Sequence, residues 1–452
     1  MKQIVETARK VPVLAETDVL VVGSGPGGLA AAIAAAREGV DTMLVERFGC
    51  FGGTITQVGV ESIAWYRYRD TVDVEGIGIE FEQRTKAMGG TTPFPQGNSD
   101  LLDAEVFKVV ADEMVQEAGV EPLLHALAVD VVMEGNAIRG IVIESKSGRQ
   151  AILARRVIDA TGDADIAVRA GASYRKTPRE EMMGVTVVFS CSGVDREQFL
   201  AYVREHPTTI ADWHKDWSAQ SSGKEKEIFS PYLGEIFDRA RADGLIPREM
   251  TSISGTWSSL KETGEATGLN LVYMLGYDAT DVRDLTRAEM EGRRLVMLAI
   301  EAMRRYAPGW EKARLRNFGM RVGVRDTRKI IGRYNITERD VRNQARFDDA
   351  IGIFPEFIDG YGVVILPTTG RYFQVPYGIL VPQRVENLLV AGRCVAGDKI
   401  SHAALRSMMA CTVTGQGAGV AAAVSLKQGV ASSQVDVARV QRALCRQGVR
   451  ID

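Results

Sequence analysis

The chain has 452 residues, of which 45% are hydrophobic and 25% are charged, and this length and composition predict a globular protein with two or three structural units. Its 55 basic and 58 acidic residues give a formal net charge of −3. Because neither sign of charge dominates, nucleic acid and anionic membrane surfaces are excluded as expected partners.

Charges are scattered through residues 1–18, so the N-terminus lacks the basic start and apolar stretch of an export signal. The most Ala- and Gly-rich stretch, residues 410–424, is expected to be shorter than the run of about 18 apolar residues that spans a membrane. The five cysteines are odd in number and lack a C-x-x-C pair, which argues against a disulfide framework, a zinc site and a dithiol redox centre. We therefore expect a cytoplasmic protein with reduced thiols, no metal and no membrane span.

Residues 18–46 predict a β-α-β unit with two parallel strands. The apolar run DVLVV at 18–22 predicts a buried strand, and residues 29–39 are rich in the best helix formers. Gly39 is expected to end that helix, because a left-handed residue is favoured there. A second strand, DTMLVE at 41–46, follows at once.

The next segment predicts a helix and a β-meander. Apolar residues at helical spacing indicate a helix over 101–118 that Gly119 ends. Four short β-rich runs follow, separated by turn residues, and the last two are QAILA at 150–154 and RVIDATG at 156–162. These runs predict a meander that returns to the sheet.

The composition changes between about 176 and 370, where four of the five tryptophans and long charged helices occur. One helix is predicted over residues 285–307, and the S/T-x-x-E spacing of Thr286 and Glu289 indicates a capping box at its start. From 371 onward the chain returns to strand, turn and small-residue helix.

A glycine-rich loop carries the strongest functional signal. Gly23, Gly25 and Gly28 form G-x-G-x-x-G directly after a strand and before a helix, so backbone amides can approach a pyrophosphate at the helix N-terminus. Glu46 ends the second strand, where a carboxylate bonds the hydroxyls of an adenosine ribose and disfavours a 2′-phosphate. A glycine-rich turn without a ligand is the weaker interpretation.

The glycine loop alone does not choose between NAD and FAD, and three further features favour FAD. Gly52 and Gly53 follow Glu46 closely, in a loop where the backbone can lie against an extended cofactor. VIDATGD at 157–163 and NLLVAGR at 387–393 are apolar strands that end in small residues, as expected where the chain passes a dinucleotide.

These motifs, with GVRDTRKIIGRYNITERD at 323–340 and the segment 376–397, resemble the FAD-dependent oxidoreductase family with the glutathione-reductase type of FAD domain. That family is related to the succinate dehydrogenase and fumarate reductase flavoproteins. The resemblance covers nearly the whole chain and implies FAD as cofactor. The residues expected to contact FAD are Gly23, Gly25, Pro26, Gly27, Gly28, Glu46, Arg47, Gly52, Gly53, Thr54, Ala128, Ala160, Thr161, Gly162, Gly392, Arg393, Ser407 and Met408.

The resemblance implies an α/β fold whose domains are discontinuous. A Rossmann-like FAD-binding domain, with a parallel sheet and a β-meander, is expected from three pieces of chain. An α+β substrate or cap domain would complete the molecule. The expected FAD-binding pieces are residues 1–60, 101–175 and 371–452, and the cap pieces are residues 61–100 and 176–370.

Candidate catalytic residues lie near the second end of the cofactor. Where the fumarate reductase branch has Gly-Glu followed by H-G-x-x-R, this chain has Gly392-Arg393, then His402 and Arg406 at the same four-residue spacing. The change from Glu to Arg alters the charge expected near the flavin, where a cation stabilises the reduced form. His402 is interpreted as a substrate ligand or proton carrier, and a structural histidine bonded to backbone is the alternative.

A basic cluster at residues 320–334 offers two more candidates. The family has an R-x-x-R pair near the active site, and Arg325 and Arg328 match it. A guanidinium suits a carboxylate or polarised carbonyl, so one of the two is expected to face substrate, and a salt-bridged surface segment is the alternative. AWYRY at 64–68 is a candidate aromatic wall or ordinary core packing, and histidines 125, 206 and 214 are expected to be structural or surface residues.

No second dinucleotide-binding unit is predicted. Gly415, Gly417 and Gly419 follow no clear strand and have no acidic partner downstream, so we interpret them as close helix packing. Without a separate nicotinamide domain, oxygen, a quinone, another flavin and a transiently bound nicotinamide all remain open as electron acceptors. A homo-oligomer also remains open.

The resulting hypothesis is an FAD-dependent dehydrogenase or oxidase. It would transfer a hydride between flavin N5 and a small polar substrate bearing a carbonyl, hydroxyl or carboxylate. Reduction of an activated C=C bond is the near alternative, and a non-catalytic binding protein with an FAD fold is the alternative of another class. Cys50 lacks a second cysteine nearby, so it is interpreted as a tolerated small residue, with covalent attachment to flavin as the lesser alternative.

Overall fold

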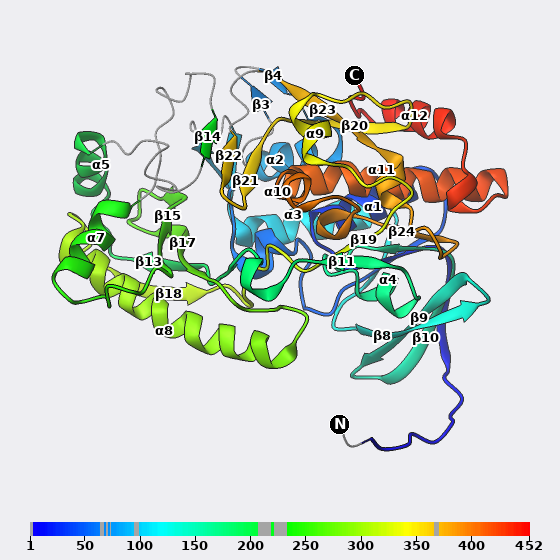
Figure 1. Cartoon of the computed structure of the whole chain (residues 1–452), viewed down its shortest axis with the longest axis horizontal. Coiled ribbons are helices and arrows are strands. Elements are labelled where there is room, and N and C mark those ends of the chain that lie inside the picture. The colour runs from blue at the N-terminus through cyan, green and yellow to red at the C-terminus, as the bar shows by residue number, and fades with distance from the viewer. Residues whose placement is uncertain are drawn as a thin grey trace.

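A computed structural model of the protein describes residues 3–63, 67–68, 71–72, 74–94, 99–206, 218–220, 233–365 and 370–452. In Figure 1 the segments that begin and end the chain pack together around one sheet, and the central segment, drawn in green, forms a second part beside them. The architecture is mixed α/β with a largely parallel sheet, which confirms the predicted fold class.

The main sheet contains five parallel strands. In spatial order these are β7 (Glu121–Leu123), β2 (Thr42–Val45), β1 (Val13–Val22), β10 (Gly148–Asp159) and β24 (Leu388–Val390). Strands β2 and β24 and the last four residues of β1 and β10 are buried on both faces, so their apolar runs do not alternate. The predicted β-α-β unit is confirmed, because β1 and β2 pair in parallel.

Two helices pack tightly against each other on this sheet. Helix α1 (Pro26–Arg37) ends before Gly39, whose φ of 75° confirms the predicted left-handed stop. Helix α11 (Met408–Gln428) lies against it, and a Cβ at Gly415 or Gly419 would overlap carbonyl oxygens of α1. Close helix packing, as predicted for these glycines, is therefore confirmed.

Helix α11 is longer than the sequence suggested. It has 21 residues, and among the described residues it is the one helix long and apolar enough to cross a membrane by length and composition alone. The expectation that this stretch is too short was therefore wrong. The apolar window of α11 is wholly buried within the protein, and burial in the core accounts for its composition.

The predicted meander is present, with one change. Strands β8 (Leu127–Glu134) and β9 (Ala137–Ser145) run antiparallel and lead into β10. The runs at 150–154 and 156–162 were expected as separate, but most of both lies in β10, which is continuous through Arg155 and Arg156. The two consecutive arginines do not break the strand. Arg155 forms an ion pair with Asp18 at the surface, and the buried Arg156 donates a hydrogen bond to Ser425 Oγ.

Two predicted helix starts were wrong. Helix α3 (Ala104–Glu117) begins three residues later than expected, because residues 101 and 102 belong to strand β6 (Ser99–Leu102). Asp103 caps it by accepting hydrogen bonds from the backbone N–H groups of residues 105 and 106. A strand and a cap thus occupy the first residues of an apolar pattern that looked helical throughout.

Helix α8 (Val282–Tyr306) begins earlier than the predicted capping box. Its N-cap is Asp281, and Thr286 lies one turn inside the helix, where its hydroxyl donates to the Val282 carbonyl. Glu289 instead accepts a hydrogen bond from the backbone of a distant segment, Val322 N–H. The S/T-x-x-E spacing was therefore coincidental here.

Buried apolar side chains form two clusters. One fills the space around the main sheet, and the other lies between residues 185 and 322 and includes α8 and strand β17 (Ala266–Met274). Buried residues between 330 and 365 belong to the first cluster. The predicted domain boundaries remain predictions.

The remaining elements complete both parts of the chain. They are β3 (Arg67–Tyr68), β4 (Thr71–Val72), α2 (Ile77–Ala87), β5 (Thr91–Phe94), α4 (Asp165–Arg169), β11 (Tyr174–Lys176), β12 (Val185–Thr186), β13 (Phe189–Ser192), α5 (Arg196–Glu205), β14 (Ser218–Gln220), α7 (Gly234–Ala242), β15 (Ile253–Thr256), β16 (Ser259–Leu260), β18 (Arg314–Phe318), β19 (Arg328–Ile330), α9 (Glu338–Arg342), β20 (Ala350–Pro355), β21 (Ile358–Gly360), β22 (Val363–Ile365), β23 (Tyr372–Pro376), α10 (Lys399–Leu405) and α12 (Val437–Arg446), with short helices η1 (Thr54–Val58), η3 (Arg179–Glu181), η5 (Tyr377–Leu380), η6 (Gly392–Cys394) and η7 (Ser432–Gln434).

Candidate functional site

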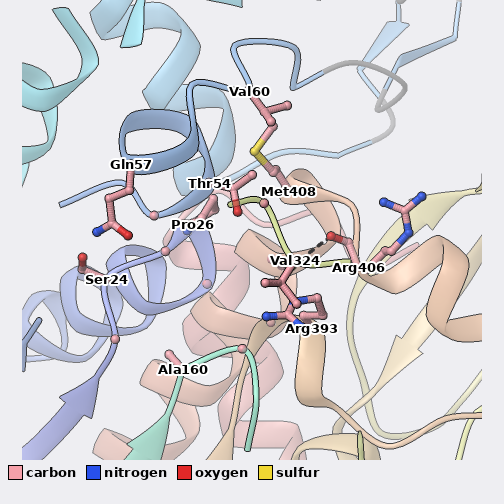
Figure 2. A pocket seen from close by; sticks show the side chains of 18 of the residues that line it. Ser24, Pro26, Thr54, Gln57, Val60, Ala160, Val324, Arg393, Arg406 and Met408 are labelled. Carbon is pink, nitrogen blue, oxygen red and sulfur yellow. Dashed lines mark hydrogen bonds between the residues drawn. The ribbon is translucent and has the colours of Figure 1, made fainter. Parts of the chain in front are cut away.

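A large cavity lies at the carboxyl ends of strands β1, β2 and β10, where open α/β sheets bind ligands. Its volume is about 330 Å³. Figure 2 shows side chains from three parts of the chain around this space, among them Ser24 in the glycine loop, Thr54 in η1 and Arg393 near the C-terminus. The predicted cofactor residues that line it are Gly23, Gly25, Pro26, Gly27, Glu46, Arg47, Gly53, Thr54, Ala128, Ala160, Thr161, Gly162, Gly392, Arg393, Ser407 and Met408.

The glycine loop leaves room for a ligand at one position. A Cβ on Gly25 would meet nothing within 4 Å, so this residue borders open space at the N-terminus of α1. Gly53 packs so closely that a Cβ on it would lie 2.5 Å from the Cα of Gly25. Gly28 and Gly52 do not line the cavity; a Cβ on Gly28 would overlap the Gly23 carbonyl. The loop therefore fits a pyrophosphate at a helix N-terminus.

Glu46 is held in place at the cavity wall. Its buried carboxylate accepts hydrogen bonds from Ser24 N–H at 2.9 Å, from Ser24 Oγ at 2.6 Å and from Phe48 N–H at 3.0 Å. A carboxylate has about four lone-pair sites. One of them is free for a ribose hydroxyl, whereas Glu46 was expected from the sequence to bond both hydroxyls, and the contact with ribose stays a prediction.

The loop after β10 is shaped by a buried aspartate. Asp159 accepts from Thr161 N–H and Thr161 Oγ through one oxygen, and from the backbone N–H groups of Ile166 and Ala167 in α4 through the other. This arrangement places Ala160, Thr161 and Gly162 against the cavity. Gly162 has a φ of 80°, and a Cβ there would lie 3.0 Å from the Arg393 guanidinium.

Arg393, which stands in place of the glutamate of the fumarate reductase branch, forms an ion pair. Its guanidinium donates to Asp163 Oδ1 at 2.8 Å and to Thr327 Oγ1 at 3.2 Å. Burial lowers the pKa of Arg393, but the Asp163 carboxylate more than offsets this effect, so the pKa lies above its ordinary value. The extra positive charge at this position is thus balanced by Asp163.

The two arginines of the R-x-x-R pair have different surroundings. Arg325 lines the cavity, lies 5.0 Å from the centre of the Tyr273 ring and donates to the Gly184 carbonyl at 3.1 Å. Arg328 does not line the cavity and instead donates to Asp165 Oδ1 at 3.0 Å. Of this pair, only Arg325 is placed to meet a ligand.

His402 lies behind the cavity wall and not in it. Its Nε2 lies 3.0 Å from the Arg325 carbonyl oxygen; a carbonyl only accepts, so this nitrogen carries the proton. Burial, followed by the charge of Lys329, lowers the pKa of His402 to about 3, so the ring is neutral. Asp326 lies nearby, at 3.8 Å. The geometry disfavours a direct contact with substrate and matches the alternative of a histidine bonded to backbone.

Arg406, the other half of the predicted pair, does line the cavity. Its guanidinium pairs with Asp359 at 2.9 Å, and its buried Nε has no hydrogen-bond partner among the described residues. Arg406 and Asp359 line the cavity together with Arg325, and they are close enough for their charges to act on its guanidinium.

Several cavity residues were missed by the sequence analysis. Thr186, Trp257 and Asn270 come from the central region and carry no motif, so no local signal marked them. The Thr186 hydroxyl lies 2.7 Å from the Val272 carbonyl oxygen and also contacts the Asn270 side chain, and this contact helps to hold Asn270 at the cavity wall. Arg321 also lines the cavity. It belongs to the basic cluster, which was the one signal that pointed to it.

The remaining candidates lie away from the cavity or outside the described residues. Cys50 does not line it, and its Sγ lies 3.8 Å from both Thr56 Oγ1 and Met320 Sδ. His125 and His206 are exposed. His214 and most of the segment 64–68 lie outside the described residues. In the part of the chain that the structure describes, no group of three His, Cys, Asp or Glu residues is placed to hold a metal ion.

A glycine loop at the helix N-terminus, a glutamate at the end of the second strand and a parallel sheet together define a dinucleotide-binding protein. The chain belongs to the FAD dependent oxidoreductase family, which it matches over residues 18–444. FAD is therefore its cofactor, and the protein is an enzyme of that family.

Known relatives match parts of the chain. Thiamine thiazole synthase of Methanococcus vannielii is 31% identical over 161 residues, which cover 33% of this chain and 57% of the relative. Digeranylgeranylglycerophospholipid reductase 2 of Methanococcoides burtonii is 25% identical over 234 residues, which cover 48% of this chain and 55% of the relative. The chain thus spans somewhat more than half the length of these relatives. A geranylgeranyl bacteriochlorophyll reductase-like structure from Thermoplasma acidophilum shares 14% identity, with a TM-score of 0.49 over 96% of this chain and 84% of that one.

Proposed function

We propose that this protein is an FAD-dependent dehydrogenase or oxidase of a small polar organic substrate. When bound, FAD supplies a flavin that accepts or donates a hydride at N5. The observation that carries the proposal is that one cavity is lined both by the cofactor loop and by Arg325, which has no carboxylate within ion-pairing distance among the described residues. A partly buried guanidinium that borders a cavity without a counter-ion suits a carbonyl, hydroxyl or carboxylate oxygen of a substrate.

The side chains near Arg325 support orientation of such a substrate. Asn270 lines the same cavity with a polar side chain that can bond a substrate oxygen or hydroxyl. Arg406 also lines this cavity, with its charge balanced by Asp359. We assign His402 a positioning role, since it holds the carbonyl of Arg325 and stays neutral at physiological pH.

Anaerobic flavin reduction tests the proposal. Purified protein should be yellow and should be bleached by at least one member of a panel of small alcohols, amines and carboxylic acids. Arg325→Met should keep the flavin but lose most of the bleaching rate. Arg316→Met is a matched control on β18, since Arg316 pairs with Glu265 and does not line the cavity. Equal rates in wild type and Arg325→Met would contradict the assigned role.

Reduction of an activated C=C bond is the second candidate, and a reductase among the curated relatives favours it. In that case the panel would fail to bleach the oxidised flavin, but an enoate or similar acceptor would reoxidise flavin that had been reduced chemically. A colourless protein that FAD cannot reconstitute would instead support a non-catalytic binding protein. The electron acceptor, a cytoplasmic location and a homo-oligomer stay predictions.

A further inference from the structure

Arg321 is a partly buried arginine that the cofactor motifs do not include. It lies on the segment 319–323 of the central region, and its guanidinium lines the cavity beside the loop that follows Glu46. Its guanidinium carbon is 5.6 Å from the centre of the Phe48 ring, and that of Arg47 is 4.9 Å from the same centre. Two guanidinium groups therefore flank one aromatic ring at the wall of the cavity.

Two hydrogen bonds to Gln57, one from the side chain and one from the backbone, fix the position of Arg321. Its Nε donates to Gln57 Oε1 at 3.1 Å, and its backbone N–H donates to the Gln57 carbonyl at 3.2 Å. Gln57 lies in the π-helix η1 and is itself anchored, because its Nε2 donates to the Cys50 carbonyl at 3.0 Å. A π-helical turn is often found at functional sites. The hydrogen bonds leave the two terminal nitrogens of Arg321 available to a ligand.

Glycines allow the segment 319–323 to approach η1. A Cβ at Gly319 would overlap the Val58 carbonyl oxygen, and a Cβ at Gly323 would lie 2.9 Å from the Val58 side chain. The close approach brings Arg321 from the central region to the loop of the FAD-binding region. Its contacts with Gln57 are therefore part of the packing and not a chance surface encounter.

Arg321 and Arg47 lack an opposite charge. Among the described residues neither has a carboxylate within ion-pairing distance, whereas the neighbouring Arg393 pairs with Asp163. Burial, followed by the charge of Arg47, lowers the pKa of Arg321 to about 10, which leaves it protonated at neutral pH. Arg321 is partly buried and lies beside the second cation Arg47, which is exposed, so an anion in the cavity would relieve the repulsion between the two guanidinium groups.

We propose that Arg321 and Arg47 bind the pyrophosphate of FAD from the side opposite the glycine loop. Arg321 packs against Phe48, whose backbone N–H donates to Glu46, so its guanidinium lies close to the ribose end of the cavity, where the adjoining pyrophosphate is expected. The pyrophosphate carries two negative charges, which match the two guanidinium groups. The inference rests on FAD as the cofactor and adds a residue from the central region to its site.

This role has a structural consequence for the substrate side. Arg325 follows Arg321 by four residues, in a segment that Gln57 ties to the loop after Glu46. A cofactor phosphate bound to Arg321 would therefore stabilise the segment that presents Arg325 to the cavity. FAD binding and the ordering of the substrate residues are coupled in this proposal.

Ligand binding to full-length protein stripped of FAD tests the proposal. FAD, ADP and adenosine are titrated into wild type, Arg321→Gln, Arg321→Lys and the control Arg316→Gln. We expect the substitution Arg321→Gln to weaken the binding of FAD and of ADP by the same factor, roughly tenfold or more, and to leave the affinity for adenosine unchanged. The affinity of Arg321→Lys for FAD and ADP should lie between those of wild type and Arg321→Gln, because lysine keeps the positive charge but cannot donate two parallel hydrogen bonds as a guanidinium does. Raising the salt concentration should weaken FAD binding more in wild type than in Arg321→Gln.

Two outcomes would overturn the proposal. If Arg321→Gln bound ADP with unchanged affinity but FAD with lower affinity, Arg321 would lie at the flavin and not at the pyrophosphate. A lower melting temperature of the stripped Arg321→Gln protein, with an unchanged rise on adding FAD, would indicate a purely structural role. The proposal expects the opposite, an unchanged or higher melting temperature and a smaller rise with FAD. Wild type that binds neither FAD nor ADP would contradict the cofactor assignment itself, separately from the role of Arg321.

Discussion

Glu61 offers a test of the electrostatics beside the cavity. Its carboxyl is 6% exposed, accepts a hydrogen bond from Thr267 Oγ1 at 2.6 Å and lies behind Gly268, which lines the cavity. Burial raises the pKa of Glu61 from 4.5 to about 7, and the hydrogen bond from Thr267 opposes this effect only in part. The folded protein therefore holds this proton more tightly than the unfolded chain does.

The expected consequence is a loss of stability as the pH rises. Between pH 4.5 and about 7 the unfolded chain releases the proton while the folded protein keeps it, so the free energy of unfolding falls with pH. At about 1.4 kcal/mol for each pH unit, the whole effect is about 3 kcal/mol. Glu61→Gln resembles the protonated carboxyl and cannot ionise, so it should gain about 3 kcal/mol relative to wild type across this window.

Urea denaturation of wild type and Glu61→Gln, at several pH values below 4.5 and above 7, measures the difference. Glu105→Gln is the matched control, because that glutamate is on the surface of α3 with its side chain 74% exposed. The difference between wild type and Glu61→Gln should grow across the window and stay constant on either side of it. Parallel stability profiles for the two proteins would refute the argument that burial holds the proton on Glu61.

Three further predictions concern packing, the cofactor loop and the thiols. Gly415→Ala should lower the free energy of unfolding by about 1–3 kcal/mol, because its Cβ would overlap the Gly27 carbonyl; an unchanged melting temperature would contradict this. Gly25→Ala should leave the stripped protein as stable as wild type, since its φ of −61° suits alanine, but should lower the flavin absorbance of purified protein. Full flavin content would show that no ligand passes over Gly25. Iodoacetamide should modify the exposed Cys445 before Cys50, because burial raises the pKa of the Cys50 thiol; faster labelling of Cys50, detected by mass spectrometry, would contradict that shift.

The parts of the fold that the sequence predicted well are short and contiguous. The β-α-β unit needs only an apolar run, a glycine loop and a helix that ends at Gly39, and all of these lie within about 30 residues. The errors arose where distant residues decided the outcome. Arg156 continues strand β10 because Ser425 accepts its hydrogen bond, and Glu289 meets Val322 instead of capping α8.

The candidate catalytic residues show the same contrast. The four-residue spacing of His402 and Arg406 was visible, but helix α10 turns His402 toward the carbonyl of Arg325, while Arg406 follows the helix and borders the cavity. The R-x-x-R pattern did not reveal which arginine faces a ligand. Asp165 on α4 decides this, because it takes Arg328 into an ion pair.

The sequence by itself determined the family, the cofactor and the residues of the glycine loop. Those features depend on backbone conformation, which glycines and a following helix specify locally. Only the tertiary structure decided which side chains meet in the cavity from the central region, such as Arg321, Asn270 and Arg325. The physical reason is that packing between segments far apart in the chain sets the direction of these side chains. A local sequence pattern does not show which distant segment a side chain will contact.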